Sequence, residues 1–263
     1  MLDDWIYNSP PWVSSSVFIL CGILVSGLVV LVASALARLE TRHTHNEFTA
    51  LTVANIAVLY TVLLAFIAVA AWEDLSKASD IAGTEAGLVQ DLYVDSQGLS
   101  DQRAAKELQK TLRHYIDAVV NREWPEQQAG GISRAAEPPL RDFRGTVAAL
   151  QPRTQGDAIV MQEMLRSLNE LYNARRSRLD AAAGHIPGAV WWVVIFLGLL
   201  TVGFTGLLGM RSPWMHFALV AGLTTAMVVV VSLIVQLDYP FRGTISVSAD
   251  PYRQVLTDVR DSE

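Results

Sequence analysis

The chain has 263 residues, of which 51% are hydrophobic and only 17% are charged, whereas charged residues make up about a quarter of a typical soluble domain. The formal net charge is -6, and no basic stripe is present that could neutralise phosphates, so the composition excludes a nucleic-acid-binding protein. The single cysteine, Cys21, lies inside an apolar stretch and excludes an intramolecular disulfide.

Charged residues are missing from four long stretches of about 25 residues each. A helix of this length can cross the hydrocarbon core of a bilayer. Aromatic residues flank these stretches, as they do at membrane surfaces. The predicted spans are Val13 to Ala37, Phe48 to Trp72, Ile186 to Met210 and Ser212 to Leu237. The sequence therefore predicts an all-α membrane protein with two pairs of transmembrane helices.

Residues 73 to 185 form a polar segment with helical periodicity, which predicts a helical extramembrane domain without a sheet. Apolar residues follow helical spacing from Leu108 to Val120 and from Val160 to Leu179, with Ser100 and Asp101 placed to cap the first of these helices. A shorter helix is predicted over 139–150, after a loop over 127–139. The second span can also continue out of the membrane as one long helix, through Tyr93.

Four parts are thus expected along the chain: transmembrane helices over 1–72, the helical domain over 73–185, transmembrane helices over 186–237 and a C-terminal tail over 238–263. In the tail, an extended segment over 245–248 precedes Asp250-Pro251, a typical helix start. A short helix should follow, to about Val259.

Four spans place both termini and the helical domain on the same side of the membrane. The short loops on the other side carry Arg38, Arg42 and Arg211. By the positive-inside rule these loops face the cytoplasm, and the helical domain faces away from it.

No sequence motif of an enzyme is present, neither a hydrolase elbow nor a phosphate loop, and no cofactor is predicted. His43, His45 and Glu47 lie close together, but a single loop is an incomplete metal site without ligands from a second element. The preferred interpretation is a polar loop without metal. Gly203, Gly206 and Gly209 lie inside the third span, where small residues permit close helix packing.

The second span carries a polar residue, Asn55, about two turns inside it. An intramembrane polar group faces either a water-filled path or a neighbouring helix that accepts a hydrogen bond. The candidate pore-lining residues on this helix are Thr52, Asn55, Leu59, Leu63 and Phe66. The apolar members of this set could form a constriction or face lipid.

A second candidate site is a charge cluster at the membrane interface. Its members are Arg175, Arg176, Arg178, Asp238 and Arg242. Ion pairs with Asp238, Glu73 and Asp74 that fix the domain against the bilayer are the simpler interpretation, and binding of anions or lipid headgroups is the functional one.

Several short motifs resemble those of the bacterial bestrophin-like membrane proteins. They are His45-Asn46-Glu47, Tyr60 to Phe66, Trp72-Glu73, Glu123-Trp124-Pro125 and Leu237-Asp238-Tyr239-Pro240-Phe241-Arg242-Gly243. The resemblance implies kinship to bestrophins, which are pentameric ion channels whose pore is lined by the second transmembrane helix. Bestrophins place the helical domain in the cytoplasm, opposite to the charge-based expectation, and no acidic calcium clasp is visible in this sequence.

Two functions follow from these expectations. The first is a homo-oligomeric ion channel of the bacterial cytoplasmic membrane, with ions and lipid as its partners, because four helices of one subunit are too few to enclose a hydrated pore. The second is a non-conducting membrane scaffold or sensor whose helical domain binds a partner or ligand.

Overall fold

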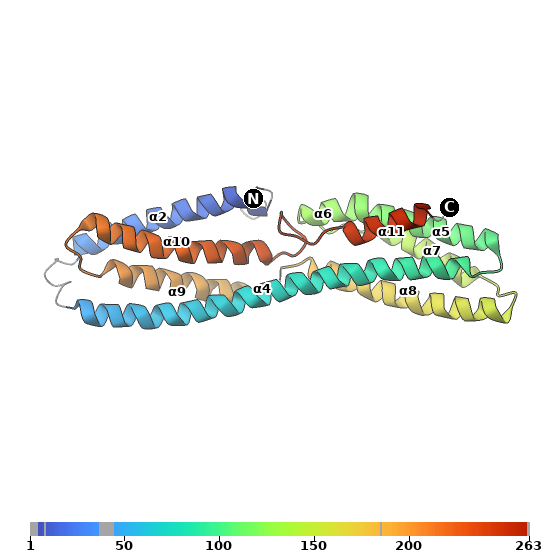
Figure 1. The fold of residues 1–263 in the computed structure, drawn as a ribbon, viewed down its shortest axis with the longest axis horizontal. Coiled ribbons are helices and arrows are strands. Elements are labelled where there is room, and N and C mark those ends of the chain that lie inside the picture. Colours follow the sequence, from blue (N-terminus) through green and yellow to red (C-terminus); the bar gives the residue numbers. More distant parts are fainter. Residues whose placement is uncertain (1–4, 8, 37–44, 185, 262–263) are drawn as a thin grey trace. The chain divides into compact units, whose positions relative to one another are not determined.

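The structure is a computed structural model that describes residues 5–7, 9–36, 45–184 and 186–261. Within these ranges the chain is helical and contains no β-strand (Figure 1). It divides into two compact units. The membrane unit comprises Met1–Glu73 and His185–Asp238, and the helical unit comprises Asp74–Gly184 and Tyr239–Glu263. Arg38, Arg42 and His43 lie outside the described residues.

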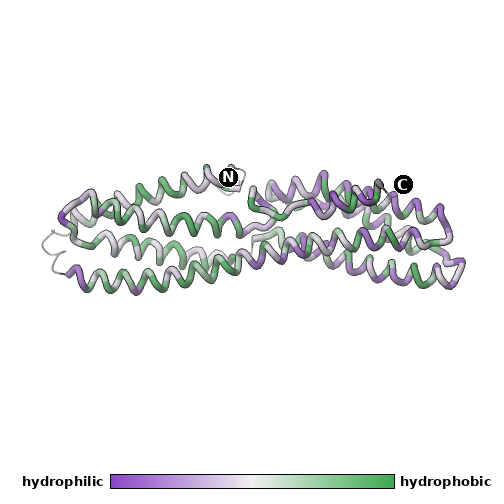
Figure 2. Tube along the Cα trace, in the orientation of Figure 1, coloured by the Kyte–Doolittle hydropathy of each residue, from purple (hydrophilic) through white to green (hydrophobic). Residues whose placement is uncertain are grey.

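The membrane unit contains α2 (Pro11–Leu36), the first half of α4 (Asn46–Gln97), α9 (Gly188–Gly206) and α10 (Pro213–Leu237). In a bilayer only a helix satisfies every backbone hydrogen bond within one segment, so long charge-free stretches become helices. Among the described residues, these four helices are long and apolar enough to cross a membrane. The predicted all-α fold class is confirmed, and Figure 2 shows their apolar character.

Small and polar residues join α2 to α10. The Ser26 hydroxyl donates a hydrogen bond to Thr224 Oγ1 over 2.9 Å, and the hydroxyls of Ser15 and Ser232 lie 2.9 Å apart. A Cβ added at Gly22 would lie 3.1 Å from Val228. The hydrophobic effect does not drive helices together inside lipid. Close packing of small residues and hydrogen bonds between helices hold α2 against α10 instead.

The described spans differ from expectation by more than two residues at two boundaries. The helix α4 continues past Trp72 to Gln97, as the sequence allowed. The helix α9 ends at Gly206, before the expected Met210. The Asn46 side chain holds the following turn, because its amide donates to the Gly209 carbonyl and accepts from the Gly209 N–H, over 2.9 and 2.7 Å.

The helical unit contains the second half of α4, α5 (Gln102–Ala118), η1 (Val119–Glu123), α6 (Trp124–Gln128), α7 (Glu137–Ala149), α8 (Gln155–Ala181) and α11 (Asp250–Asp261). The apolar stripes predicted from helical spacing form its core. Leu108, Leu112 and Ile116 of α5 pack with Met164 and Leu168 of α8 in one buried cluster. Because both stripes have a period near 3.6, each helix buries one face and leaves the other exposed.

Side-chain caps fix the starts of α5 and α8. Asp101 caps α5 by accepting from the N–H groups of Arg103 and Ala104. Thr154 and Asp157 form a capping box at the start of α8. Ser100, also expected to cap α5, instead donates its N–H and hydroxyl to Asp157, over 3.0 and 2.6 Å.

The C-terminal tail packs on the helical unit. The rings of Phe241 and Tyr252 each lie 5.4 Å from the Trp124 ring, centroid to centroid. Helix α11 begins at Asp250, as the sequence predicted. Residues 245–246 form a bend and residues 247–248 have no regular secondary structure. The Val247 N–H donates a hydrogen bond to the Pro240 carbonyl over 2.8 Å.

Candidate functional site

Within the membrane unit, α4 has two faces. Tyr60, Leu64 and Ile67 are buried and pack against Val194 of α9 and Ile234 of α10. These α4 residues are three or four positions apart, so they form one side of the helix.

The five predicted pore-lining residues follow a different stripe. Each helical residue advances about 100°, so the stripe lies roughly 110° from the buried face. Its members are Thr52, Asn55, Leu59, Leu63 and Phe66. Leu59 is 64% exposed and Phe66 is 72% exposed. Leu63 is half-buried against the cluster around Tyr60. The stripe is thus free of the subunit's own helices along most of its length.

Asn55 is the chemically unusual member of this stripe. Its side chain is exposed, and it makes no hydrogen bond to any residue that the structure describes. Thr52, one turn earlier, satisfies its hydroxyl by donating to the Phe48 carbonyl over 2.9 Å. The Asn55 amide has two N–H donors and one carbonyl oxygen, and one hydrogen bond to the helix backbone cannot satisfy all of them. Asn55 is therefore suited to face water or a polar group of another molecule.

Two pockets that open onto the surface of the membrane unit are apolar, unlike the part of the stripe around Asn55. A cavity of about 280 Å³ between the helices is lined by apolar side chains with Tyr60, Cys21 and Thr224 among them. A second, of about 620 Å³ between α2 and α9, is lined wholly by apolar residues and glycine. Ions need polar groups to replace their hydration shell, so neither cavity suits an ion path.

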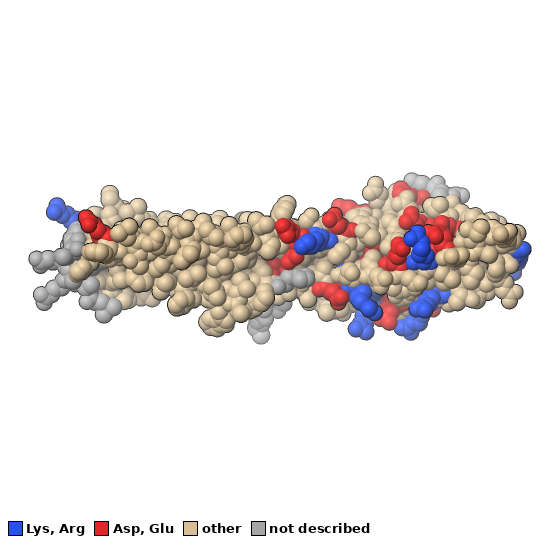
Figure 3. Space-filling view, turned by 90° about the horizontal axis from the view of Figure 1, so that it is seen from below, with Lys and Arg blue, Asp and Glu red and all other residues tan. Residues whose placement is uncertain are grey.

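The outer surface of the membrane unit agrees with lipid contact. On the face shown in Figure 3, charged residues are absent between the two ends of this unit. Large apolar side chains of this unit, such as Leu24 of α2 and Trp192 of α9, are exposed, at 73% and 76%. No group of His, Cys, Asp and Glu residues that could hold a metal exists among the described residues, and His45 is exposed.

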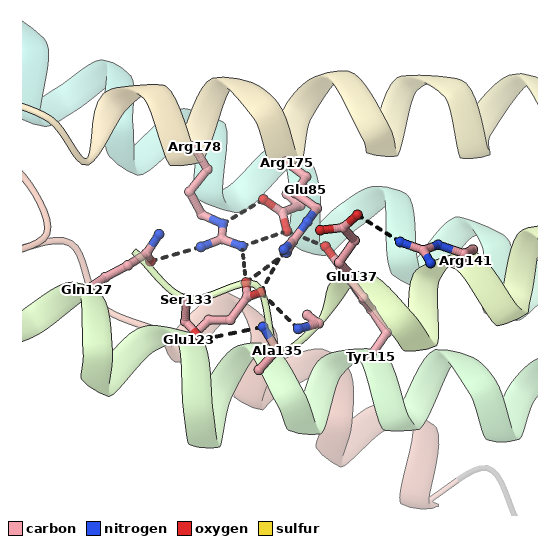
Figure 4. A network of polar contacts seen from close by, with 11 residues as sticks. Glu85, Tyr115, Glu123, Gln127, Ser133, Ala135, Glu137, Arg141, Arg175 and Arg178 are labelled. Atoms are coloured by element: carbon pink, nitrogen blue, oxygen red, sulfur yellow. Dashed lines mark hydrogen bonds and ion pairs between the residues drawn. The ribbon is translucent and has the colours of Figure 1, made fainter. Parts of the chain in front are cut away.

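A buried charge network lies inside the helical unit (Figure 4). Arg175 binds Glu123 through two hydrogen bonds, of 2.7 and 2.6 Å. Arg178 donates to Glu85 over 2.7 Å, to Glu123 over 3.0 Å and to the side-chain amide oxygen of Gln127 over 2.8 Å. All four charged side chains are buried, so the two positive charges are neutralised by two negative ones.

Aromatic groups and the backbone complete this network. The Tyr115 hydroxyl donates to Glu85 over 2.5 Å, and the Ala136 N–H donates to Glu123 over 2.8 Å. The Arg178 guanidinium lies 5.5 Å from the Trp124 ring centre, within the range of a cation–π contact. The network thus ties α4, α5, η1 and α8 together.

Burial and charge shift the pKa values of these groups. Burial raises the pKa of Tyr115 well above its usual value, and the Glu85 charge raises it further. Burial would raise the pKa of Glu123, but hydrogen bonds and charge from Arg175 outweigh it and lower that pKa. Burial opposes the charged form of Arg178, but the Glu85 carboxylate raises the Arg178 pKa. Glu123 and Arg178 are therefore held in their ionised forms, whereas the raised pKa keeps the Tyr115 hydroxyl neutral.

The partners of these arginines differ from those expected. The sequence paired them with Asp238, Glu73 and Asp74, yet Arg175 and Arg178 lie on the buried side of α8 and meet Glu123 and Glu85. Buried arginines need fixed partners because an unpaired buried charge is very costly.

The other members of the predicted charge cluster have separate environments. Arg176 is exposed. Asp238 accepts the Ile186 N–H over 3.0 Å. The Arg242 guanidinium stacks on the Tyr239 ring at 5.4 Å and packs against Gly130, whose positive φ and missing side chain leave room for it.

Glu85 was not identified from the sequence, although one signal was available, and Glu123 was noted only as part of the Glu123-Trp124-Pro125 motif. Glu85 lies among Ala78, Ala82 and Val89, all fully buried. A carboxylate in such a stripe predicts a buried partner.

The fold and this interior define the class: a multi-pass helical membrane protein with a helical extramembrane unit built around paired charges. The sequence matches the Bestrophin-like domain over residues 20–252, and the chain belongs to that family. The resemblance seen in the short motifs is thereby confirmed. No curated protein matches the sequence.

The fold is similar to crystal structures of a bacterial bestrophin homologue from Klebsiella pneumoniae. A variant with an isoleucine-to-threonine substitution shares 12% identity at a TM-score of 0.70, covering 94% of this chain and 100% of that chain. A variant with an aspartate-to-alanine substitution shares 14% at 0.68, covering 92% and 98%. A membrane protein with a proline-to-alanine substitution shares 12% at 0.68, covering 94% and 98%. At these identities the likeness shows the fold alone.

Proposed function

We propose that the chain is one subunit of a homo-oligomeric ion channel of the bacterial cytoplasmic membrane, with its pore lined by the outward stripe of α4. The observation that carries this proposal is Asn55, a polar side chain inside a span that is exposed and without a partner among the described residues. Facing lipid, its amide would lose its hydrogen bonds to water at a cost of about 1–3 kcal/mol or more.

An oligomer gives Asn55 a suitable environment. When copies of α4 surround a symmetry axis, the amides form a polar ring that can replace part of an ion's hydration shell. The apolar pockets of the membrane unit do not offer such a path. Membership of the Bestrophin-like family supports this arrangement, and the resemblance to bestrophins favours five subunits.

The stripe also supplies a constriction. Leu63 and Phe66 follow Asn55 by about 12 and 16 Å along the helix, at 1.5 Å per residue. Apolar rings gate by losing water, so polarity at the narrowest ring controls conduction more than side-chain size does.

The test is ion flux into liposomes that contain equal amounts of each variant. Leu63→Ser and Phe66→Ser should raise flux several-fold because they let water wet the constriction. Asn55→Leu should lower flux because it removes the polar ring. The matched control is Val58→Ser, which changes an exposed apolar residue roughly 100° from the stripe; its flux should equal that of the unmodified chain.

The alternative function, a non-conducting scaffold or sensor, predicts a different result. No flux would be measured for the unmodified chain or for any variant while the oligomer remained intact. That outcome would end the channel proposal.

A further inference from the structure

The helical unit carries two exposed charged faces on different helices. The acidic face is formed by Asp80 and Asp91 of α4, and the basic face by Lys106 and Lys110 of α5 with Arg122 of η1. These five side chains are exposed, and none forms an ion pair with a residue that the structure describes. One exposed acidic residue, Asp117, also lies on this side of α5 and accepts a hydrogen bond from Asn121 over 2.8 Å. Some other exposed charges of this unit, Arg166 with Glu163 and Arg141 with Glu137, are paired locally.

The two faces lie at matching levels. Only residues 98–101 separate the end of α4 from the start of α5, and the two helices run in opposite directions (Figure 1). The hydrogen bond from Tyr115 to Glu85 shows which levels of the two helices lie side by side. Tyr115 is 13 positions after the start of α5, and Glu85 is 12 positions before the end of α4.

From the end of α4, Asp91 lies about 9 Å and Asp80 about 26 Å back along the helix. From the start of α5, Lys110 lies about 12 Å and Arg122 about 30 Å further along. Each acidic residue therefore lies within about 4 Å of the level of a basic one, a difference that a lysine or arginine side chain can span.

The surface of α4 between the two acidic residues is open. A Cβ added at Gly83 or Gly87 would meet no atom within 4 Å. These glycines fall on the same side of the helix as Asp80 and Asp91, at spacings of three and four. A second chain can approach the backbone closely there, with Val94, 57% exposed, as an apolar contact at one end.

We propose that the basic face of α5 and η1 in one copy docks on the acidic face of α4 in the next copy. The inference rests on the proposed oligomer, whose axis runs along α4. Rotation about such an axis keeps every residue at its level, so Asp91 meets Lys110 and Asp80 meets Arg122 without a shift. Because the two faces differ, the contact is heterologous, and repetition closes a ring.

Charge reversal tests this contact in detergent-extracted or nanodisc-embedded full-length chain. Asp80→Lys with Asp91→Lys, and separately Lys110→Glu with Arg122→Glu, should reduce the particle mass towards that of one 28.8 kDa chain, most strongly at low salt. All four substitutions together should restore the oligomer, because the attraction is re-created with opposite sign. The control pair Glu126→Lys and Asp142→Lys makes the same charge change at exposed positions elsewhere and should leave the mass unchanged.

Cross-linking gives an independent measurement that does not depend on disrupting the contact. In a Cys21→Ser background, Asp91→Cys and Lys110→Cys in one chain should give a ladder of linked subunits with a short bis-maleimide. Either cysteine alone should give none, because a heterologous contact does not place a residue beside its own copy.

The outcomes separate this proposal from the channel itself. If the unmodified oligomer conducts, and neither reversal lowers its mass nor the paired cysteines cross-link, the docking faces are wrong while the channel stands. If an oligomer held by these faces forms but does not conduct, the channel is wrong and the docking stands. A linked dimer from either single cysteine would replace the heterologous contact with a symmetric one.

Discussion

At the scale of single residues, the core of the helical unit depends on paired charges. Arg178 is fully buried and contacts Glu85, Glu123 and Gln127. Hydrophobic residues of similar volume can replace a whole buried ion-pair network at little cost, but removal of one partner leaves an uncompensated charge. The network is therefore sensitive to single substitutions, although its net contribution to stability is small.

Arg178→Met should lower the free energy of unfolding by about 3–5 kcal/mol, because Glu85 loses its guanidinium partner inside the core. The matched control is Arg176→Met, two residues earlier on the same helix and exposed, which should change stability by less than about 0.5 kcal/mol. Unfolding of the purified full-length chain, followed by circular dichroism, measures both. Equal effects of the two substitutions would show that Arg178 is not held by the network.

At the scale of elements, Asp157 joins α8 to the turn before α5. Its carboxylate accepts from Ser100, Arg153 and Thr154. Hydrogen bonds from the Ser100 hydroxyl and N–H, together with those from the Arg153 and Thr154 N–H groups, hold the pKa of Asp157 well below its usual range. A lowered pKa in the folded state means that this stabilisation is present above the unfolded value, about 3.9, and is lost as the pH falls below it.

Asp157→Asn should therefore lower the unfolding midpoint at pH 7 and have progressively less effect below about pH 4, where the carboxylate contribution in the unmodified chain also disappears. Unfolding curves between pH 3 and 7 give the difference at each pH. Asp142→Asn on α7 is the control, since Asp142 is exposed. A difference at Asp157 that stayed constant with pH would contradict the explanation.

Helix packing in the membrane unit gives a second prediction at this scale. A Cβ at Gly206 would clash with Val29 of α2, whereas a Cβ at Gly203 would meet nothing within 4 Å. Gly206→Ala should destabilise the chain by about 1–3 kcal/mol through overpacking. Gly203→Ala should be neutral or slightly stabilising, because alanine favours the helix. An equal change in the thermal midpoint for both variants would show that helix propensity determines the stability change, and not the contact of position 206 with Val29.

The sequence predicted the elements well because their signals are local. Absence of charge over about 25 residues gave the spans, and apolar spacing gave α5 and α8. The stripe from Thr52 to Phe66 follows from the same periodicity. These features depend only on neighbours along one helix.

Partner choice could not be read in this way. Arg178 meets Glu85 across 93 positions of the chain and Glu123 across 55, and helical periodicity does not say which faces of separate helices meet. The end of α9 was placed too late for a related reason: Leu207 to Met210 are as apolar as the helix before them, and the turn is set by the long-range contact of Asn46 with Gly209.

At the scale of the whole molecule, the direction of the chain through the membrane is set during insertion. Positive charges in short loops remain on the cytoplasmic side, whereas long domains count little. Arg38, Arg42 and Arg211 lie in the short loops, which predicts that residues 73–185 face away from the cytoplasm. The resemblance to bestrophins predicts the reverse, so the two arguments lead to opposite experimental results.

Labelling of one exposed cysteine in intact cells decides between them. Ile132, in the loop before α7, is 70% exposed and is therefore a suitable position for the cysteine. The neighbouring Ser133 is only 7% exposed, so a cysteine there would not be accessible to the reagent. In a Cys21→Ser background, Ile132→Cys should react with a membrane-impermeant maleimide from outside, because the short-loop arginines hold the opposite side in the cytoplasm. Reaction only after lysis would place the helical unit in the cytoplasm. Cys21→Ser without the new cysteine should not react in either case, which shows that the signal comes from position 132.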